Sequence, residues 1–444
     1  MSHHTEQQGP PSGCPAHNIA LYGPEFGANP DNHYEYLRQF GASTPVDIAP
    51  GVEVELVTSY TAALQILQNP GTFVRDSRRW RALKEGRVPA DSPALPMMGY
   101  RPNALFSDGA AHARLRQAVT DSLATVDEHR LTRQVQQVAD YLISQFSSRR
   151  GGQADLVADY AQQLPLLVYS DLFGCPAAIG DRVILGISGI FEGAPGANEV
   201  LGQALSELIT LKRHTPGDDV TSRMMQHPSN LTDMEMVDQL VTLLSGGTAP
   251  LLSLISIGTA LMLGDEKYIQ TQTSSGLLVE DAVNEVLWNY APIANYAVHY
   301  PVQDVELDGR TLHANDPVVI SFAAANRDPA LLEDRRTLSG RAHLAFGAGP
   351  HVCPAKDPAM VIAVTAIESL LNKLPDVELR TDIQNLSWVP APWSRALVSL
   401  PARFTPVAPK VAPAAAAQQT AEQAPAQSAK NTRWSRFLTW LNGA

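Results

Sequence analysis

The sequence has few cysteines, no excess of positive charge and no apolar leader. Only three cysteines occur in 444 residues, and Cys14, Cys175 and Cys353 lie too far apart for a C-x-x-C motif or a disulfide framework. The formal net charge of −12 argues against a nucleic-acid partner, which would require a basic face. The first residues are polar and proline-rich, unlike a signal peptide, so we expect a cytoplasmic protein.

Charge is also missing from a long internal run. No charged residue lies between Leu240 and Gly264, a stretch that is long enough to cross a bilayer. The run nevertheless contains many small and polar residues: Ser245, Gly246, Gly247, Thr248, Pro250, Ser253, Ser256 and Thr259. This composition favours a helix buried inside a large protein over a transmembrane span.

The apolar periodicity of the chain predicts mostly helices. Helical spacing occurs over residues 32–41, 61–70, 111–124, 231–244, 279–292 and 359–374. Alternation over residues 52–60 predicts a strand, and residues 305–322 predict a hairpin that turns at Asp308-Gly309. We therefore expect a mainly α protein with a minor β component, built as one large helical domain with small sheets and without internal repeats.

Composition divides the chain into four parts. We expect a disordered segment over residues 1–20, a globular domain over 21–405, a disordered Ala/Pro/Gln linker over 406–430 and an amphipathic helix over 431–444. The last segment carries one apolar stripe, formed by Trp434, Phe437, Leu438 and Leu441. Two alternatives follow. The helix packs back on its own domain, or it is a tethered anchor for a partner protein or a membrane surface, which would make the protein peripherally membrane-associated.

One cysteine lies in a loop that suits a ligand better than a packed core. The stretch runs Phe346-Gly347-x-Gly349-x-His351-x-Cys353. Its two glycines allow backbone angles that other residues avoid, so the loop can press against a flat ligand. The cysteine directly precedes a long apolar helix, whose N-terminal N–H groups should lower the pKa of the thiol and favour the thiolate.

This loop resembles the cysteine loop of the cytochrome P450 superfamily, F-G-x-G-x-H-x-C-x-G, with Ala355 in place of the last glycine. The resemblance extends from about residue 21 to residue 400. It includes the "HARLR" helix and the "NRDP" segment that begins at Asn326. It implies the cytochrome P450 fold and a haem b cofactor with Cys353 as the axial iron ligand. It also implies oxidation of a small apolar substrate with electrons from a ferredoxin-type partner.

The same resemblance implies which residues hold the haem carboxylates. His112 and Arg116 match the helix that meets a haem propionate, and His351 belongs to the cysteine loop. His299 lies where relatives commonly have a propionate-binding arginine. Such charge-assisted partners are needed if a pair of propionates is partly buried.

Two departures from the family pattern stand out. The family's E-x-x-R motif is Glu285-Val286-Leu287-Trp288 here, which resembles an actinobacterial subgroup with E-x-x-W. Because a stranded buried charge is costly, Glu285 must find another donor, and Arg327 and Arg341 are the candidates. Trp288 would replace part of the missing contact through its packing area and its single N–H.

The second departure lies in the uncharged helix. Where most relatives have [A/G]-G-x-[D/E]-T, this chain has Gly246-Gly247-Thr248-Ala249-Pro250, so the acid and the alcohol that relay protons are replaced. Pro250 lacks an N–H and frees a carbonyl in the preceding turn. That carbonyl, Thr248 and Ser253 are candidates to hold water, but none has the pKa of an acid.

Two functions are therefore weighed. The first is a haem-thiolate monooxygenase with an altered proton supply and slow, uncoupled or peroxide-driven turnover. The second is a haem-binding regulatory or scaffold protein with little catalytic activity. The expected Soret band of the reduced carbon monoxide complex discriminates between them, because it reports thiolate ligation.

Overall fold

The computed structural model describes residues 19–149, 151–191, 194–271, 278–331, 340–407 and 433–441. Its helices are α1 (Gly23–Ala28), α2 (Pro30–Arg38), α3 (Tyr60–Leu67), α4 (Arg81–Lys84), α5 (Leu95–Met98), α6 (Gly109–Leu123), α7 (Glu128–Phe146), α8 (Gln163–Leu172), α9 (Ala177–Phe191), α10 (Ala197–His214), α11 (Val220–Gln226), α12 (Asp233–Gly264), α13 (Glu266–Thr271), α14 (Val279–Asn289), α15 (Phe322–Ala325), α16 (Lys356–Lys373) and α17 (Arg433–Leu441). Its strands are β1 (Ser43–Ala49), β2 (Val52–Val57), β3 (Phe73–Val74), β4 (Gln153–Asp155), β5 (Asn295–Pro301), β6 (Val305–Leu307), β7 (Arg310–Leu312), β8 (Val318–Ser321), β9 (Glu378–Leu379) and β10 (Pro401–Arg403).

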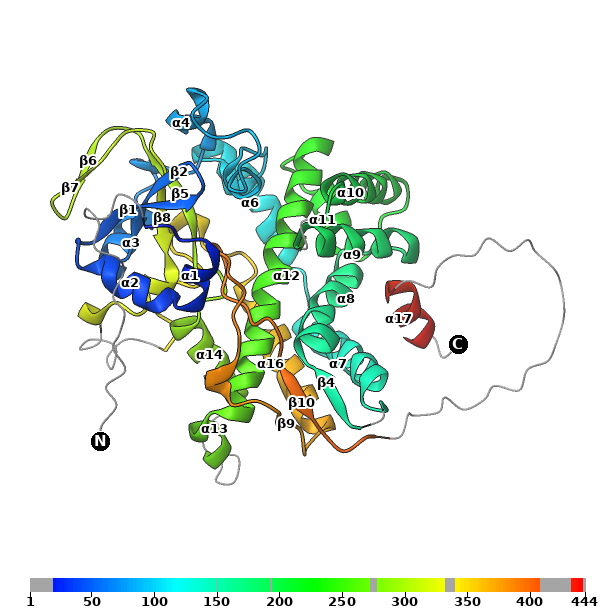
Figure 1. Ribbon diagram of the computed structural model, residues 1–444. Coiled ribbons are helices and arrows are strands. Elements are labelled where there is room, and N and C mark those ends of the chain that lie inside the picture. Colours follow the sequence, from blue (N-terminus) through cyan, green and yellow to red (C-terminus); the bar gives the residue numbers. More distant parts are fainter. Residues whose placement is uncertain are drawn as a thin grey trace, which may run out of the picture.

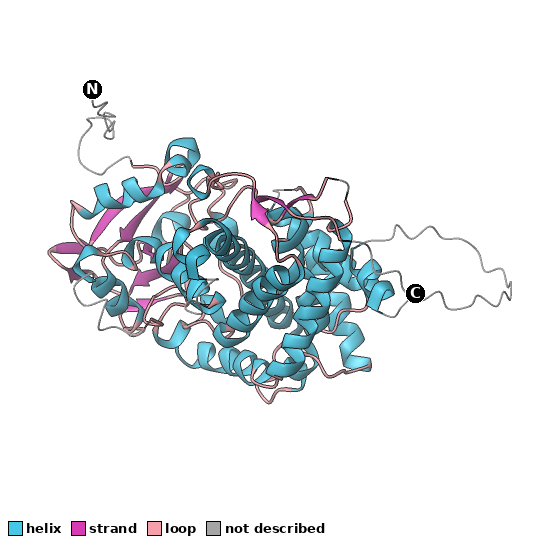
Figure 2. Cartoon of the chain, turned by 90° about the horizontal axis from the view of Figure 1, so that it is seen from below, coloured by secondary structure: helices cyan, strands magenta, loops and turns pink. Residues whose placement is uncertain are grey.

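The strands form three small sheets beside a much larger helical part (Figures 1 and 2). The largest sheet has the order β1-β2-β8-β5-β3, in which only β2 and β8 run parallel. The order β4-β10-β9 forms a second sheet, and β6 and β7 form the predicted hairpin. Asp308 and Gly309 have φ angles of 47° and 79° at its turn, which the Asp-Gly pair permits. The mainly α fold with minor β is therefore confirmed.

The uncharged run forms all of helix α12 after its first two turns, and the helix crosses the middle of the molecule (Figure 1). The helix begins with the capping box between Thr232 and Glu235. It packs against α8, α10, α14 and α16. Among the described residues, α12 is the one helix long and apolar enough to cross a membrane. Half of its most apolar segment is buried inside the protein.

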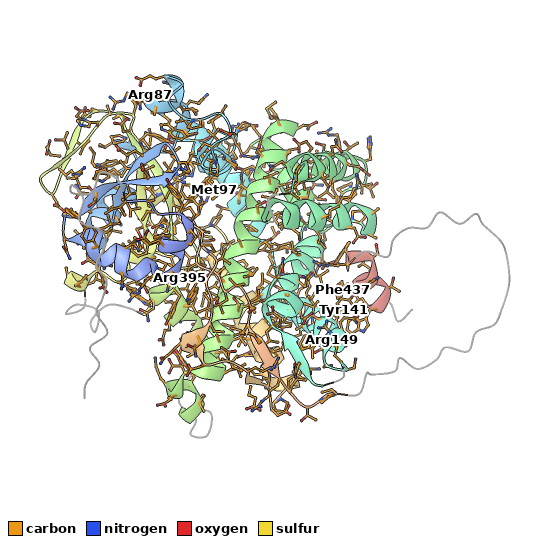
Figure 3. All side chains as sticks on the ribbon, viewed as in Figure 1. Arg87, Met97, Tyr141, Arg149, Arg395 and Phe437 are labelled. Atoms are coloured by element: carbon orange, nitrogen blue, oxygen red, sulfur yellow. The ribbon has the colours of Figure 1, made fainter. Side chains whose placement is uncertain are left out.

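The C-terminal helix α17 packs on the chain's own helices α7, α8 and α9. Trp434 and Phe437 are 1% and 2% exposed, and Phe437 meets the ring of Tyr141 at 5.3 Å between centroids (Figure 3). The indole N–H of Trp434 donates to the carbonyl of Cys175 at 3.0 Å. The first of the two alternatives for this helix therefore holds. The expectation of a free anchor is corrected, because its own domain covers Trp434 and Phe437, while Leu441 at the end of the apolar stripe stays 42% exposed. The expected linker lies almost entirely outside the described residues.

Candidate functional site

The cysteine loop lies in the chain between α15, which follows β8, and helix α16. Its two glycines determine its shape. Gly347 and Gly349 have φ angles of 72° and 67°, as the sequence predicts. A Cβ atom at Gly349 would overlap the carbonyl of Leu67 at the end of α3, so only glycine fits there. The N–H of Cys353 donates to the carbonyl of Phe346 at 2.8 Å and closes the loop on itself. The backbone of the loop is thus held in place at Cys353, the residue that carries the thiol.

The electrostatics of the Cys353 thiol differ from the sequence prediction. Burial raises the pKa of Cys353 above its usual value, although a backbone N–H of Ala355 and the guanidinium of Arg116 act in the opposite direction. The expectation that the start of α16 lowers this pKa was wrong in its net direction. The physical reason is that desolvation outweighs the nearby donors. A metal ion bonded to the sulfur would reverse this balance, because a coordinating thiol is deprotonated.

Two histidines face each other close to the loop. The rings of His112, on α6, and His351 are 4.0 Å apart between centroids. The Nε2 atom of His112 is buried and has no hydrogen-bond partner among the described residues. Burial and the neighbouring His351 lower the pKa of His112 to about 4. A buried nitrogen without a partner is rare in proteins, which indicates that a polar ligand completes this site.

His299, on β5, joins the same group of side chains. Its Nδ1 atom lies 2.5 Å from the carbonyl oxygen of Ala297. Burial, the charge of Arg75 and the proximity of His351 hold the pKa of His299 well below its usual value. The structure therefore brings together three of the four predicted propionate donors.

Arg116, the fourth, turns toward the cysteine loop instead. Its Nη2 atom donates to the carbonyl of Val352, and its Nε atom donates to Thr120 at 3.1 Å. In this arrangement Arg116 is a neighbour of the thiol, and its charge also acts on His112 and His351.

The sequence analysis missed Arg75, which follows β3 directly and is 4% exposed. It acts electrostatically on the three histidines described above. The nearest acid, Asp108, accepts the backbone N–H groups of Arg75 and Asp76, and it lies 3.9 Å from His351. The signal in the sequence was a lone arginine after two apolar strand residues, which does not by itself distinguish a buried from an exposed side chain.

The altered segment of α12 carries two hydroxyls that bond within the helix. Thr248 donates to the carbonyl of Leu244 at 2.6 Å, and Ser253 donates to the carbonyl of Ala249 at 3.3 Å. Pro250 lies inside the helix and offers no N–H to the turn before it. Beside it, no atom lies within 4 Å of the position that a Cβ atom would take at Gly246, so this face of the helix borders open space.

Glu285 and Trp288 are stabilised by partners other than those expected for the glutamate. Tyr268 and Lys267 donate to the Glu285 carboxylate at 2.7 and 2.8 Å. The expectation that Arg327 serves Glu285 was wrong, because its guanidinium pairs with Asp31 at 2.7 Å near the start of the domain.

Arg341, the other candidate, is found 2.7 Å from Glu280. The indole N–H of Trp288 donates to the carbonyl of Gly340 at 2.6 Å, and the ring meets His343 edge-on. Trp288 therefore connects α14 to the segment that leads into the cysteine loop. This is the role that the sequence predicts for its N–H and its packing area.

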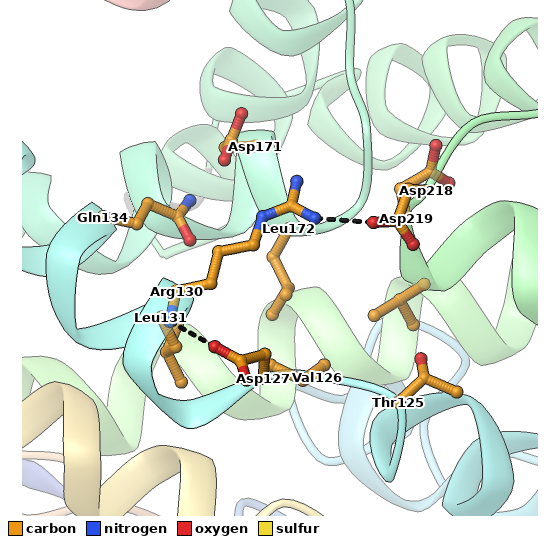
Figure 4. A pocket seen from close by; sticks show the side chains of 11 residues that line it. Thr125, Val126, Asp127, Arg130, Leu131, Gln134, Asp171, Leu172, Asp218 and Asp219 are labelled. Carbon is orange, nitrogen blue, oxygen red and sulfur yellow. Dashed lines mark hydrogen bonds and ion pairs between the residues drawn. The ribbon is translucent and has the colours of Figure 1, made fainter.

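Two surface cavities lie outside this group of residues. One, of about 90 Å³, is lined by charged side chains that already have partners: Arg130 reaches Asp218 at 2.7 Å, and Asp127 accepts the backbone N–H of Arg130 (Figure 4). The other, of about 380 Å³, opens beside the cysteine loop, where Phe346, Lys356 and Met360 contribute to its lining. The second cavity is thus the one that adjoins the candidate site.

Comparisons with known proteins identify relatives of this chain. No family model matches the chain. The cytochrome P450 monooxygenase PikC of Streptomyces venezuelae is 30% identical over 415 residues, which cover 90% of this chain and 96% of PikC. The 2-hydroxy-5-methyl-1-naphthoate 7-hydroxylase of Streptomyces carzinostaticus is 27% identical, with coverage of 80% and 90%. Among solved structures, CYP154A1 from Streptomyces coelicolor A3(2) matches with a TM-score of 0.76 at 27% identity and covers 87% of this chain and 100% of its own.

Proposed function

This chain belongs to the cytochrome P450 superfamily, and from that premise we propose that it is a haem-thiolate monooxygenase whose iron is held by Cys353. It is an enzyme of the P450 monooxygenase type, and its cofactor is haem b. The observation that carries the assignment to Cys353 is the closed glycine loop that presents this thiol beside a group of buried, partly unpartnered nitrogen bases.

The residues present fit a haem. Bound haem supplies the oxygen chemistry of this enzyme class, and the thiolate ligand tunes it by electron donation. The cysteine loop holds the sulfur in one direction because Gly347 and Gly349 bend the backbone and the Cys353 N–H is tied to Phe346. His112, His299 and His351 are buried or nearly so and direct nitrogen atoms to one region, where they would hold the propionates by hydrogen bonds.

Proton supply is the altered part of the machinery. Ala249 and Pro250 offer neither a carboxyl nor a hydroxyl group. The Thr248 hydroxyl donates a hydrogen bond to the carbonyl of Leu244 in its own helix. Protons would therefore reach the open face at Gly246 through bound water. The carbonyl freed by Pro250, the Thr248 hydroxyl as an acceptor and Ser253 would hold that water. Such a relay contains no group with the pKa of an acid, so we expect slow turnover that releases peroxide, or turnover driven by added peroxide.

Restoring the missing groups tests this account of proton supply. The double substitution Ala249→Asp and Pro250→Thr places an acid and an alcohol at the two positions. We expect the ratio of product formed to NADPH consumed to rise about tenfold. This is less than the roughly 10²–10⁴-fold that a positioned proton donor contributes to a rate, because the ratio cannot exceed one. The matched control is Thr259→Ala, which removes a hydroxyl that bonds to the carbonyl of Ile255 on the same helix, away from the altered segment. An unchanged ratio in the double variant, with intact haem content, would refute the proposed role of these positions.

Electrons would come from a ferredoxin-type protein in the cytoplasm. The cavity beside the cysteine loop supports this proposal, because Phe346 and Lys356 line it and both lie within a few residues of Cys353. A small redox protein seated there would be brought near the haem. The substrate would be a small apolar molecule, in line with relatives named as hydroxylases of a naphthoate and of mycinamicin IV.

Reduction under carbon monoxide tests the central assignment. We expect the red-shifted Soret band of a thiolate-ligated haem in the wild-type protein and its loss in Cys353→His, which offers a nitrogen ligand instead. A wild-type protein that binds haem without this band would refute Cys353 as the ligand.

A haem-binding regulatory role is the second candidate, and the loss of the acid–alcohol pair favours it. It predicts a haem complex without the thiolate band, and no product with either NADPH-driven ferredoxin or peroxide across a panel of small apolar compounds.

A further inference from the structure

Arg75 carries a buried positive charge that forms no ion pair among the described residues, although the charge of Asp108 acts on it. The side chain is 4% exposed, and its Nε atom reaches only the carbonyl of Leu105, at 3.4 Å. No ion pair joins its guanidinium to a carboxylate anywhere in the described part of the chain. The ring of Tyr296 lies 5.8 Å from the guanidinium carbon, which is a weak contact. Burying a charge in this way is strongly unfavourable unless a partner of opposite charge completes the site.

The neighbouring acid is already committed elsewhere. Both carboxylate oxygens of Asp108 accept the backbone N–H of Arg75, at 2.9 and 3.0 Å, and one of them also accepts the N–H of Asp76. These bonds hold the backbone of the turn in place and leave the guanidinium nitrogens Nη1 and Nη2 without a hydrogen bond among the described residues. The missing partner is therefore an anion that can accept from a planar, two-pronged donor.

The β-sheet places Arg75 opposite His299. Strand β3 pairs with β5 in antiparallel register, Phe73 with Pro301 and Val74 with Tyr300. The next pair in this register is Arg75 and His299, and directly opposed residues in an antiparallel pair project to the same face. Arg75 is also the charge with the largest effect on His299, whose pKa it helps to lower. His299 is consequently neutral near pH 7, and Arg75 supplies the permanent charge at this pair.

We propose that Arg75 is the main cationic ligand of a haem propionate in this chain. The family resemblance assigns a positive charge to the position of His299, on β5. In this chain the charge is carried instead by Arg75, which follows β3 and lies opposite His299. His299, His112 and His351 complete the site as neutral hydrogen-bond donors. This inference rests on the proposed haem site. It adds a residue that the P450 resemblance does not assign.

The test measures how fast haem leaves the protein when an excess of apomyoglobin scavenges it. We expect Arg75→Gln to lose haem about ten- to a hundredfold faster than the wild type, as removal of a charge-assisted hydrogen bond implies. The matched control is Arg78→Gln, three residues along the chain, where the same charge is lost from a side chain that is 64% exposed. This control should lose haem at the wild-type rate.

Two further measurements separate a propionate contact from a merely structural role. The double variant Arg75→Gln/His299→Arg returns the charge to β5 and should regain most of the haem retention. In addition, haem dimethyl ester, whose carboxylates are masked, should leave the wild-type protein much faster than haem does. For Arg75→Gln the difference between the two cofactors should be much smaller, because only the hydrogen bonds of the histidines then distinguish them. The midpoint potential of the iron should also fall in Arg75→Gln, because a positive charge near the haem disfavours the oxidised state.

The outcomes are distinct. Haem loss from Arg75→Gln at the wild-type rate, or an undiminished effect of esterification in that variant, would overturn the proposal. If Arg75→Gln does not fold, Arg75→Lys keeps the charge, and equal loss of haem and its ester from Arg75→Lys would overturn it. Failure of the proposed function is recognised separately, since the wild type itself would then lack the thiolate Soret band.

Discussion

The docking of α17 predicts opposite effects for two glycine-to-alanine substitutions. In a helix interior, alanine is favoured over glycine by about 0.5–1 kcal/mol. At Gly202, on α10, no atom lies within 4 Å of an added Cβ, so Gly202→Ala should stabilise the protein by about that amount. At Gly180, on α9, an added Cβ would overlap the Trp434 indole, with its Nε1 atom only 2.7 Å away. Gly180→Ala should therefore displace the C-terminal helix.

The cost of that displacement follows from the contacts that are lost. The Trp434 N–H bond to Cys175 contributes about 1 kcal/mol. Asp181 accepts the backbone N–H of Trp434 at 2.8 Å and the hydroxyl of Ser435 at 2.5 Å, which adds about 1 kcal/mol as a helix cap. Burial of the Trp434 and Phe437 side chains adds about 1.5–3 kcal/mol each. Since alanine returns about 0.5–1 kcal/mol of this through its helix propensity, we expect a net destabilisation of about 4–7 kcal/mol.

Urea unfolding measures the stability change, and hydrogen exchange of residues 433–441 locates it. A nine-residue helix is too short to persist undocked in water, so its amides should exchange fast in Gly180→Ala and slowly in Gly202→Ala. The reasoning is refuted if Gly180→Ala is as stabilising as Gly202→Ala and the amides of α17 stay protected. A dimer that appears only in the Gly180 variant would also refute it, because the helix would then have docked on a second copy.

Two further predictions concern the segment next to the cysteine loop. Trp288→Phe keeps most of the ring but removes the donor to Gly340, so the protein should lose about 1–2 kcal/mol in urea unfolding; no change would mean that the N–H is satisfied equally well by water. Burial lowers the pKa of His343 to about 4, below the usual value near 6.5. Between those two pH values the unfolded chain binds the proton and the folded chain does not, so stability should fall as the pH drops from about 6.5 toward 4, by up to about 3 kcal/mol from this group. His343→Gln should flatten that part of the stability–pH curve, and an unchanged slope would contradict the buried, neutral state of His343.

The sequence alone predicted the parts of this protein that are local along the chain. Helical periodicity and the Asp308-Gly309 turn depend on neighbouring residues, and both are found as expected. The cysteine loop is also local, and the positive φ angles of Gly347 and Gly349 follow from its glycine pattern. The family resemblance rested on these contiguous motifs.

Only the tertiary structure decided which distant side chains meet. The pairing of β3 with β5 brings Arg75 beside His299, although more than two hundred residues separate them in the chain. The residues around Arg75 in the sequence do not predict this contact. The partners of Glu285 turned out to be Tyr268 and Lys267, because α13 lies next to that carboxylate and Arg327 is drawn to Asp31. The apolar stripe of α17 was evident from its spacing, but the surface that it covers was not. The hydrophobic effect is non-directional, so an apolar stripe indicates that its side chains will be buried but not against which surface. The packing of α7, α8 and α9 determines that surface.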